Sequence, residues 1–403
     1  MKSFYASAEA VKRGLDPLSA KLVVVGDVNR PGSVVLAASP IMKRDYGIKT
    51  GSRRYEIPND KDIIVVNANV GYYLNLSMEI TKLFNQFVPY EAIHTYSIDE
   101  SWVCTNGTQR LFGSRREVAD RIQKELRDQT GLYCTIGIGD NTLLSKVVLD
   151  IHAKSSSSGI ADCKYEDVQR LLWPVPIKEF WGIGSRMERN LNRLGIRTIE
   201  HLAKFPREYL EKSFGIMVLQ LQNHAWGIDN SEPMGYDPVN TEKGFSHGIT
   251  LLRDYKMEEV KTVILELSEE VAKRTREAGK VGRTISLGIG YSRDEGEGGF
   301  SRSRTIDEAT NVTMDIYEVC MQLFKENYRG DLIRNVYVSI TKLDTDDGLQ
   351  LNLFQDNSKK REVGFVMDSI RNRFGPTAIL RASSYTDSGI MLQRANQIGR
   401  HRA

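Results

Sequence analysis

Long apolar runs, cysteine and histidine are what this 403-residue sequence has least of. No stretch of about 18 apolar residues occurs, so the sequence predicts no membrane-spanning helix, and residues 1–5 lack the apolar core of a signal peptide. The six histidines are dispersed, and the four cysteines have no paired spacing: Cys104, Cys134, Cys163 and Cys320. These absences argue against a disulfide framework and a Cys/His metal site, and they predict a cytoplasmic protein with reduced thiols.

A large excess of one charge is absent as well. The sequence has 55 Lys or Arg residues against 52 Asp or Glu residues, a net charge of +3. Basic residues gather locally, because residues 355–403 hold nine Lys or Arg against four Asp or Glu, and Arg302 and Arg304 stand close together. Such patches suit a phosphate backbone, and solvated surface charge is the alternative for any one of them.

The chain length indicates more than one domain. Residues 1–160 mix short apolar strands with helical stretches, residues 166–230 are strongly helical, and residues 245–345 again mix strands and helices. Residues 233–244 contain Pro, Gly and Asn without periodicity and are the best candidate for a linker. The expected fold class is therefore α+β and multidomain.

Two pairs of strands are expected in the first part of the chain. The β-rich residues 21–25 and 33–37 flank a turn at residues 29–32 that contains Pro and Gly, so they predict a hairpin. A second pair of strands, within residues 92–103, meets near Asp99.

Asp99 and Glu100 form the sharpest local feature of the sequence. Neighbours in a straight strand point to opposite faces, but at a turn both can be directed at one place. Paired carboxylates attract Mg²⁺, which prefers oxygen ligands and substrate phosphates. A two-metal site of this kind would activate a 3′-hydroxyl and stabilise a departing pyrophosphate. The alternative is an acidic hairpin tip, because Asp-Glu pairs are common.

Basic residues occur on two expected helices. Residues 38–49 predict a strand, a helix that begins at Ser and Pro, and a Gly stop, with Lys43 and Arg44 in the helix. Lys146 and Lys154 lie on a second helix that ends at a run of serines. Lys43 and Arg44 are candidates for binding a triphosphate, and solvated helix charge is the alternative for all four basic residues.

Gly182, Ile183 and Gly184, followed by a Leu-Gly-Ile triplet, have the spacing of a helix-hairpin-helix. The glycines permit a tight turn whose backbone N–H groups can meet a DNA phosphate without reading sequence. A simple helix-capping turn is the alternative. A helix-hairpin-helix nuclease would need a carboxylate cluster here, for which Glu188 and Glu200 are poor candidates.

A short apolar peptide lies in a polar setting near the C-terminal end: Gln350, Leu351, Leu353 and Phe354. Apolar side chains on a tether of this kind predict an exposed anchor for a partner protein.

The order of these motifs resembles the Y-family, or translesion, DNA polymerases. The resemblance is carried by Ser-Phe-Tyr-Ala-Ser at residues 3–7, Ala-Ala-Ser with Lys-Arg-x-Tyr-Gly-Ile-Lys at 37–49, Tyr-Ser-Ile-Asp-Glu at 96–100, the helix from 146 to 154, and Gly-Ile-Gly at 182–184. Residues 369–399 look like the UmuC-like branch, which includes ultraviolet-damage repair proteins of some prophages and plasmids.

The resemblance implies a right-hand polymerase fold with palm, fingers, a helical thumb and an added little finger. The implied parts are residues 1–3 and 70–163 for the palm, 4–69 for the fingers, 164–234 for the thumb, 235–244 for a linker, 245–345 for the little finger, and 346–403 for a tail with the clamp-binding peptide.

The resemblance also implies residue roles. Asp99 and Glu100 would be catalytic ligands of two Mg²⁺ ions, and Tyr5 would be the steric gate against a ribonucleotide 2′-hydroxyl, with Phe4 beside it. The further roles are Arg44 and Lys154 for the triphosphate, Gly182, Ile183, Gly184, Arg302 and Arg304 for DNA, and Gln350, Leu351, Leu353 and Phe354 for the bacterial sliding clamp.

Three departures from the family pattern bear on these roles. Ile41 stands where many members have a tyrosine, and Lys154 lies one residue farther from Lys146 than in many relatives. In the family, a β-strand ending in a metal-binding aspartate comes immediately before the residue that corresponds to Met1. That first palm strand is lacking in this sequence.

The expected function is template-directed nucleotidyl transfer past damaged bases, in SOS-type damage tolerance at the nucleoid. The expected partners are primer-template DNA, dNTP, the sliding clamp and possible SOS accessory proteins, with no membrane. Two explanations of the missing strand stay open. Either the start was placed too far downstream, or the product is truncated and catalytically inactive while it still binds DNA and the clamp.

Overall fold

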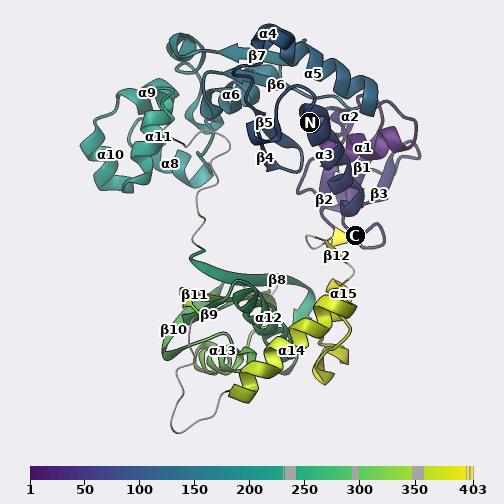
Figure 1. Cartoon of the computed structure of the whole chain (residues 1–403), viewed down its shortest axis with the longest axis vertical. Coiled ribbons are helices and arrows are strands. Elements are labelled where there is room, and N and C mark those ends of the chain that lie inside the picture. Colours follow the sequence, from purple (N-terminus) through teal and green to yellow (C-terminus); the bar gives the residue numbers. More distant parts are fainter. Residues whose placement is uncertain are drawn as a thin grey trace. The chain divides into compact units, whose positions relative to one another are not determined.

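A computed structural model describes residues 1–229, 231, 242–292, 298–346, 358–395, 397–398 and 401–402 (Figure 1). Its contacts divide the chain into a first unit, Met1–Asp237 with His401–Ala403, and a second unit, Pro238–Arg400. The division falls inside the linker expected at residues 235–244. The other expected domain boundaries stay predictions.

A small three-stranded sheet follows the first helix, α1 (Phe4–Lys12). The strand order is β2 (Val35–Ala38), β1 (Leu22–Val25), β3 (Ile64–Asn67), with β1 antiparallel to β2 and parallel to β3. The predicted hairpin is thus confirmed. Alternate residues of β1 serve opposite faces, because Leu22 and Val24 pack with α1 while Val23 and Val25 pack with Met42 of α2 (Pro40–Asp45). Both faces are buried, which explains the continuous apolar run. A 3₁₀ turn, η1 (Arg54–Glu56), precedes β3.

The next part of the first unit contains two separate two-stranded sheets. The antiparallel pair is β4 (Ile93–Ser97) and β5 (Glu100–Val103), and the parallel pair is β6 (Ile136–Gly139) and β7 (Ile160–Cys163). Within the described ranges, no further strand pairs with β5 or β6. The surrounding elements are α3 (Val70–Phe84), η2 (Tyr90–Ala92), α4 (Gln109–Phe112), α5 (Arg115–Thr130), α6 (Thr142–Val148) and the π-helical turn η3 (Leu149–Ala153).

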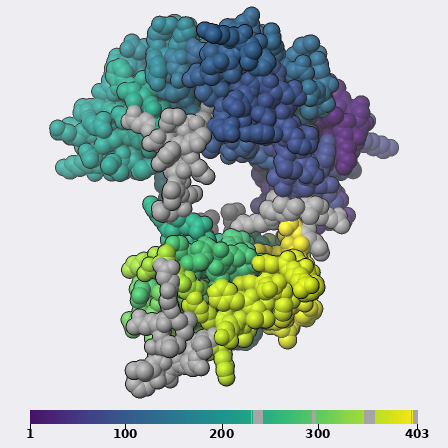
Figure 2. All heavy atoms as spheres, in the orientation of Figure 1, coloured from purple at the N-terminus to yellow at the C-terminus, as the bar shows by residue number. Residues whose placement is uncertain are grey.

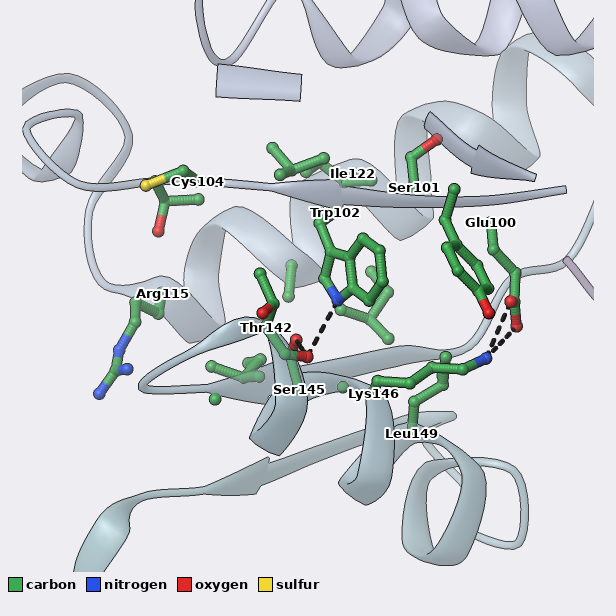
Figure 3. Close-up of a pocket in the computed structure, with 18 of the residues that line it drawn as sticks. Glu100, Ser101, Trp102, Cys104, Arg115, Ile122, Thr142, Ser145, Lys146 and Leu149 are labelled. Atoms are coloured by element: carbon green, nitrogen blue, oxygen red, sulfur yellow. Dashed lines mark hydrogen bonds and ion pairs between the residues drawn. The ribbon is translucent and has the colours of Figure 1, made fainter. Parts of the chain in front are cut away.

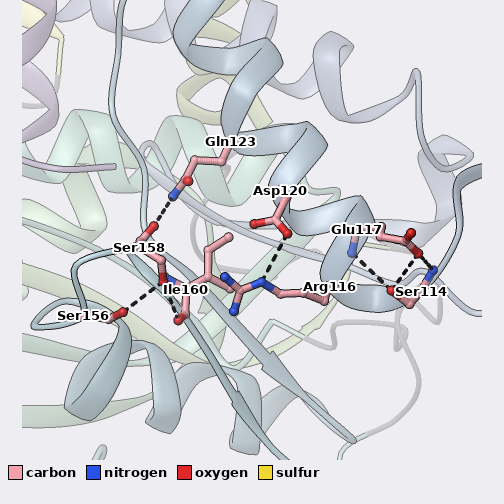
Figure 4. A network of polar contacts seen from close by, with 8 residues as sticks. All are labelled: Ser114, Arg116, Glu117, Asp120, Gln123, Ser156, Ser158 and Ile160. Atoms are coloured by element: carbon pink, nitrogen blue, oxygen red, sulfur yellow. Dashed lines mark hydrogen bonds and ion pairs between the residues drawn. The ribbon is translucent and has the colours of Figure 1, made fainter.

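Helix α5 is tied at its start and in its middle (Figure 4). Ser114 and Glu117 form a capping box, in which Ser114 Oγ accepts from the Glu117 N–H and the Glu117 carboxylate accepts from the Ser114 N–H. Farther along, Gln123 Nε2 donates to the carbonyl of Ser158 at 3.1 Å. The serine-rich segment is therefore fixed against α5 where it leads into β7.

Two glycines allow α6 to approach β6 closely. A Cβ at Gly137 would lie 2.0 Å from the carbonyl oxygen of Ser145, and one at Gly139 would lie 2.3 Å from the Ser145 nitrogen. Only glycine fits at such contacts. This close packing determines where Lys146, the next residue of α6, lies.

A helical part completes the first unit. Its elements are η4 (Tyr165–Asp167), α7 (Val168–Leu171), η5 (Ile177–Glu179), α8 (Ser185–Arg193), α9 (Ile199–Lys204), α10 (Arg207–Phe214) and α11 (Met217–Ala225). Leu191, Ile199 and Leu202 share one apolar core with Leu144 and Val147 of α6. The helical part is thus packed on the helix that carries Lys146.

The second unit is a four-stranded antiparallel sheet with two long helices packed on it. The strand order is β10 (Gly299–Thr310), β9 (Lys280–Tyr291), β11 (Ile333–Thr345), β8 (Gly244–Tyr255), and the helices are α12 (Met257–Glu277) and α13 (Thr313–Asn327). After it come α14 (Ser358–Phe374), η7 (Ala382–Tyr385), α15 (Met391–Arg394), β12 (Gln397–Ile398) and β13 (His401–Arg402).

Helix α14 is held on α12 by buried ion pairs. Arg276 Nε lies 2.7 Å from an oxygen of Asp368, and its side chain also donates to the carbonyl of Asn311 at 2.7 Å. Arg371 lies 3.1 Å from Glu269, and all four paired side chains are buried. Figure 2 shows the yellow-green spheres of this segment lying against the green spheres of the rest of the second unit.

We expect Arg276→Met to destabilise the second unit by about 3–5 kcal/mol, because it leaves the buried Asp368 carboxylate without its charged partner. Urea unfolding of the full chain, with amide hydrogen exchange read on α14, measures the effect. The double variant Arg276→Met with Asp368→Leu is the control and should recover most of the loss, since no buried charge is left alone. A single variant that costs less than about 1 kcal/mol would contradict the assigned role of the pair.

Candidate active site

A cavity of about 570 Å³ separates β5 from β6 (Figure 3). Residues 100–104, which include β5, line one side, and residues 135–140, which include β6, line the other, while α5 contributes Val118, Ala119 and Ile122. Backbone of both strands therefore borders the cavity along its length. Trp102 spans toward α6, where its Nε1 donates to the carbonyl of Thr142 at 3.0 Å.

Asp99 and Glu100 both line this cavity, at the turn between β4 and β5. Ser97 Oγ donates to an oxygen of the Asp99 carboxylate at 3.0 Å. The amino group of Met1 donates to the backbone carbonyl of Asp99 at 2.9 Å. The turn thus gathers two carboxylates and one backbone amine at one end of the cavity.

Lys146 holds Glu100 (Figure 3). Its ammonium lies 2.7 and 2.8 Å from the two carboxylate oxygens and 3.4 Å from Asp150, and its side chain is 9% exposed. Desolvation acts to lower the pKa of Lys146, but the hydrogen bonds to Glu100 and the charge of Asp150 outweigh it, so the pKa is raised. Lys154 closes the series with a 2.6 Å contact to Asp150. Glu100, Lys146, Asp150 and Lys154 therefore form a row of alternating charges.

Lys146 and Lys154 are separated by the π-helical turn η3. A π turn closes its hydrogen bond one residue later than an α turn, so it absorbs one extra residue without rotating the residues after it. Here η3 spans Leu149–Ala153, between the two lysines. Lys146 and Lys154 each lie four residues from Asp150, and both contact it.

The two carboxylates fit a divalent cation only in part. In the portion of the chain that the structure describes, no three His, Cys, Asp or Glu side chains gather to hold a metal ion. Mg²⁺ is commonly held by one or two carboxylates together with substrate phosphates and water. Asp99 and Glu100 meet that requirement for one ion and do not provide a protein-only ligand set for two.

Phe4 and Tyr5 begin α1 and differ in surroundings. Phe4 is buried in the core beneath the three-stranded sheet, and Tyr5 stacks on Tyr73 with ring centroids 4.2 Å apart. Partial burial raises the pKa of the Tyr5 hydroxyl, and the charge of Asp99 raises it further. The Tyr5 hydroxyl therefore senses the charge of Asp99, while Phe4 packs in the core beside it.

Lys43 and Arg44 point to different partners. Arg44 makes two hydrogen bonds to its neighbour Asp45 and its side chain is 72% exposed. Lys43 instead donates to Ser3 Oγ at 2.9 Å. The predicted triphosphate residue Arg44 thus lies with Asp45, and Lys43 lies at the start of α1.

The predicted DNA-binding residues belong to both units. Gly182 has φ 91°, a left-handed conformation that favours glycine, while Ile183 is buried and anchors the turn, and Gly184 caps α8. On β10 of the second unit, Arg302 donates to the carbonyl of Ser301, and Arg304 is paired with Glu326 of α13 at 2.8 Å. The charge of Arg304 is therefore already compensated.

The predicted clamp-binding residues Gln350, Leu351, Leu353 and Phe354 lie outside the described residues. Sequence reasoning singled out Lys146 together with Lys154 but did not predict its contact with Glu100. A signal was available, because Lys146, Asp150 and Lys154 recur at intervals of four residues with alternating sign.

One finding bears on membranes: no described helix is long and apolar enough to cross a bilayer.

The architecture matches that of polymerases with a right-hand fold. A chimera of the Y-family DNA polymerases Dbh and Dpo4 superposes with a TM-score of 0.65 at 22% identity, over 85% of this chain and 97% of that chain. This similarity confirms the expected α+β, multidomain fold. The fold is therefore one that this Y-family DNA polymerase chimera shares.

Sequence comparisons agree with this similarity. Models of the impB/mucB/samB family match residues 1–150, its C-terminal domain matches 242–353, and its HHH motif matches 165–196. The putative UV-damage repair protein UvrX of Bacillus subtilis (strain 168) is 54% identical over 100% of this chain and 96% of that protein. DNA polymerase IV 2 of the same organism is 39% identical over 100% and 97%. The chain belongs to the impB/mucB/samB family of Y-family polymerases.

We expect Lys146→Met to strengthen the binding of Mn²⁺ to the protein by about tenfold, which corresponds to about 1.4 kcal/mol. The reason is that Lys146 competes for both oxygens of Glu100, and its removal leaves the carboxylate free for a cation. Electron paramagnetic resonance of free Mn²⁺ measures this affinity without any catalytic step. Lys124→Met is the matched control, because Lys124 pairs with Asp128 on the exposed face of α5. Unchanged or weaker Mn²⁺ binding in Lys146→Met would show that the Lys146 ammonium and Mn²⁺ do not compete for Glu100.

Proposed function

We propose that this protein is a translesion DNA polymerase that extends a primer across damaged template bases. The observation that carries the proposal is the cavity end where Asp99 and Glu100 lie together beside Lys146 of α6 and Lys154, which directly follows η3. Family membership supports it, because relatives that match over the whole chain are named DNA polymerase IV. Those names also support DNA and dNTP as the molecules on which the chain acts.

In the proposed reaction, the primer 3′-hydroxyl gives its proton to solvent water, and its oxygen forms a bond to the α-phosphorus of the dNTP. The bond from that phosphorus to the β-phosphate oxygen breaks, and pyrophosphate leaves. Mg²⁺ held by Asp99 and Glu100 would stabilise the charge on the phosphate oxygens. The protein contributes mainly position and charge: Tyr5 stacks against Tyr73 beside the sugar, and Lys154 binds the triphosphate.

The borders of the cavity bear on whether the chain is active. Consecutive residues of β5 and of β6 line it, so backbone N–H and C=O groups of both strands face an open space. One extended strand of apolar residues would satisfy both edges. The amino group of Met1 lies at the carbonyl of Asp99, so a strand joined to Met1 would enter the cavity at the carboxylate end. An aspartate at the end of that strand would supply a third carboxylate.

The second candidate function follows from the same observation. With Asp99 and Glu100 alone, the protein would supply carboxylates for one cation, and the chain would bind DNA without extending it. The helix-hairpin-helix turn would meet the phosphate backbone in either case, since its contacts do not depend on the carboxylates. The two candidates therefore differ in catalysis and agree in DNA binding.

Primer extension with Mg²⁺ and four dNTPs separates the two candidates. We expect the chain carrying an added apolar strand that ends in aspartate, joined to Met1, to extend primers at least about a hundredfold faster than the 403-residue chain. Asp99→Asn in the longer chain should abolish extension, while an added strand ending in asparagine serves as the matched control.

Each outcome decides something. Extension by neither chain, with DNA binding retained, favours the inactive DNA-binding protein. Extension by the 403-residue chain that Asp99→Asn abolishes would mean that two carboxylates suffice. Extension that survives Asp99→Asn would contradict the assigned site altogether.

We further propose that residues 350–354 bind the bacterial sliding clamp and that SOS accessory proteins act on the same complex. A tether of this kind raises the local concentration of an enzyme that holds DNA weakly. The double variant Leu353→Ala with Phe354→Ala should weaken binding to the clamp by about a hundredfold in surface plasmon resonance, since the two side chains form most of the apolar anchor. Extension without clamp should not change. Clamp binding that withstands both substitutions would exclude this peptide as the contact.

A further inference from the structure

A row of aromatic side chains joins the helix-hairpin-helix turn to the carboxylate turn within the first unit. Trp181 directly precedes Gly182, and its ring lies edge-on to that of Tyr96, with centroids 6.4 Å apart and planes at 73°. Tyr96 in turn lies edge-on to Trp102, at 4.9 Å and 61°. Edge-on aromatic pairs at such separations are favourable beyond the area that they bury. The row therefore connects two parts of the chain that are far apart in the sequence.

Tyr96 stands at an irregularity of the β4–β5 ladder. The paired residues on either side of it are Thr95 with Ser101 and Ser97 with Glu100. Tyr96 is therefore an extra residue on β4. An extra residue of this kind bends a strand and redirects a side chain, and such irregularities are common beside active sites. Tyr96 is accordingly exposed although its ring contacts two tryptophans.

Trp181 has a second ring partner in the helical part. It stacks on His224 of α11, with planes at 13° and centroids 6.4 Å apart. Burial lowers the pKa of His224 while the charge of Asp229 acts in the opposite direction, so the imidazole is mainly uncharged near neutral pH and offers a flat apolar face. Ile183, two residues farther on, is buried in the core of the helical part. The ring of Trp181 is thus tied to the turn that begins at Gly182.

The other end of the row reaches the charges of the candidate site. The ammonium of Lys146 lies over the Tyr96 ring, 5.7 Å from its centroid, a distance at which a cation and an aromatic face attract. The same ammonium binds both carboxylate oxygens of Glu100 (Figure 3). Tyr96 thus stands between Trp181 and the ammonium that occupies Glu100.

We propose that Trp181 is a positioning residue for the turn that carries Asp99 and Glu100. It acts through Tyr96, so that DNA bound at the helix-hairpin-helix turn strengthens cation binding at the carboxylates. The inference rests on the proposed function, which supplies both the DNA and the cation. In the described residues β5 pairs with β4 alone, so side-chain contacts hold this hairpin. DNA that fixes Trp181 and Tyr96 leaves less conformational entropy to be lost when the cation orders the carboxylates.

Electron paramagnetic resonance of free Mn²⁺ tests the proposal without any catalytic step, in the presence and absence of a primer-template duplex that ends in a dideoxynucleotide. Glu100→Gln with the same DNA gives the Mn²⁺ bound elsewhere, which is subtracted. We expect DNA to tighten the remaining Mn²⁺ binding about tenfold in the wild-type chain, and by less than about twofold in Trp181→Leu or Tyr96→Leu. Trp181→Phe and Tyr96→Phe should retain most of the effect, because each keeps an aromatic ring at its position.

Trp226→Leu is the matched control. Trp226 lies in the same helical part, and its ring packs edge-on against Trp173 at 4.9 Å. This variant should leave the effect of DNA on Mn²⁺ binding unchanged.

A wild-type chain in which DNA leaves Mn²⁺ binding unchanged would overturn the inference, as would a Trp181→Leu variant that retains the full effect. If Trp181→Leu does not fold, the comparison of Tyr96→Leu with Tyr96→Phe decides in the same way. An effect of DNA that depends on Trp181, in a chain that never extends a primer, would keep the inference and reject the polymerase. Extension by a chain without this effect would do the reverse.

In an extending chain, Trp181→Leu should lower kcat at limiting Mg²⁺ and recover most of it at high Mg²⁺, because the defect lies in cation binding. A merely structural role would lower kcat or thermal stability to the same extent at every Mg²⁺ concentration. That result would also overturn the inference.

Discussion

The edges of β5 and β6 that border the cavity are the main constraint on how the candidate site of the first unit is held together. A buried backbone N–H or C=O group without a partner costs free energy comparable to a lost hydrogen bond, so strands rarely leave an inner edge open. In the described part of the first unit, β5 pairs with β4 alone and β6 with β7 alone. The hairpin is nevertheless held near α6, because Trp102 donates to Thr142 and Lys146 binds Glu100. Side-chain contacts thus bridge the space that a strand ladder would occupy.

This arrangement links stability to charge at the candidate site. The contact that holds β5 to α6 is also the contact that occupies the carboxylate of Glu100. A cation bound by Glu100 would weaken that bridge unless the released Lys146 finds another anion, and Asp150 lies 3.4 Å away. Cation binding and the position of α6 are therefore coupled through one ammonium group.

Much of the fold could be predicted from the sequence, for reasons that particular residues show. The run Leu22 to Val25 predicted a strand, and Gly182 marked a turn that requires a left-handed residue. The different partners of Lys43 and Arg44 could not be predicted: Lys43 contacts Ser3, and Arg44 contacts Asp45. Neighbouring residues on an α-helix point about 100° apart. Motif spacing alone therefore cannot say whether Lys43 or Arg44 is directed toward Ser3, because α2 has only six residues and no long apolar face that would fix its rotation. The packing of α14 on α12 could not be predicted either. Arg276 and Asp368 are buried by tertiary contacts, and the basic composition of the C-terminal residues gives no sign of such burial.

The row of charges from Glu100 to Lys154 has two negative and two positive members, so without ligands it is neutral and internally paired. A nucleotide with its cation brings both signs to the same place. If the carboxylates turn to the cation and the lysines turn to the phosphates, no buried charge is left alone at any stage. Under the proposed function, the chain would exchange internal ion pairs for contacts with the nucleotide and its cation, and no new charge would have to be buried in the protein.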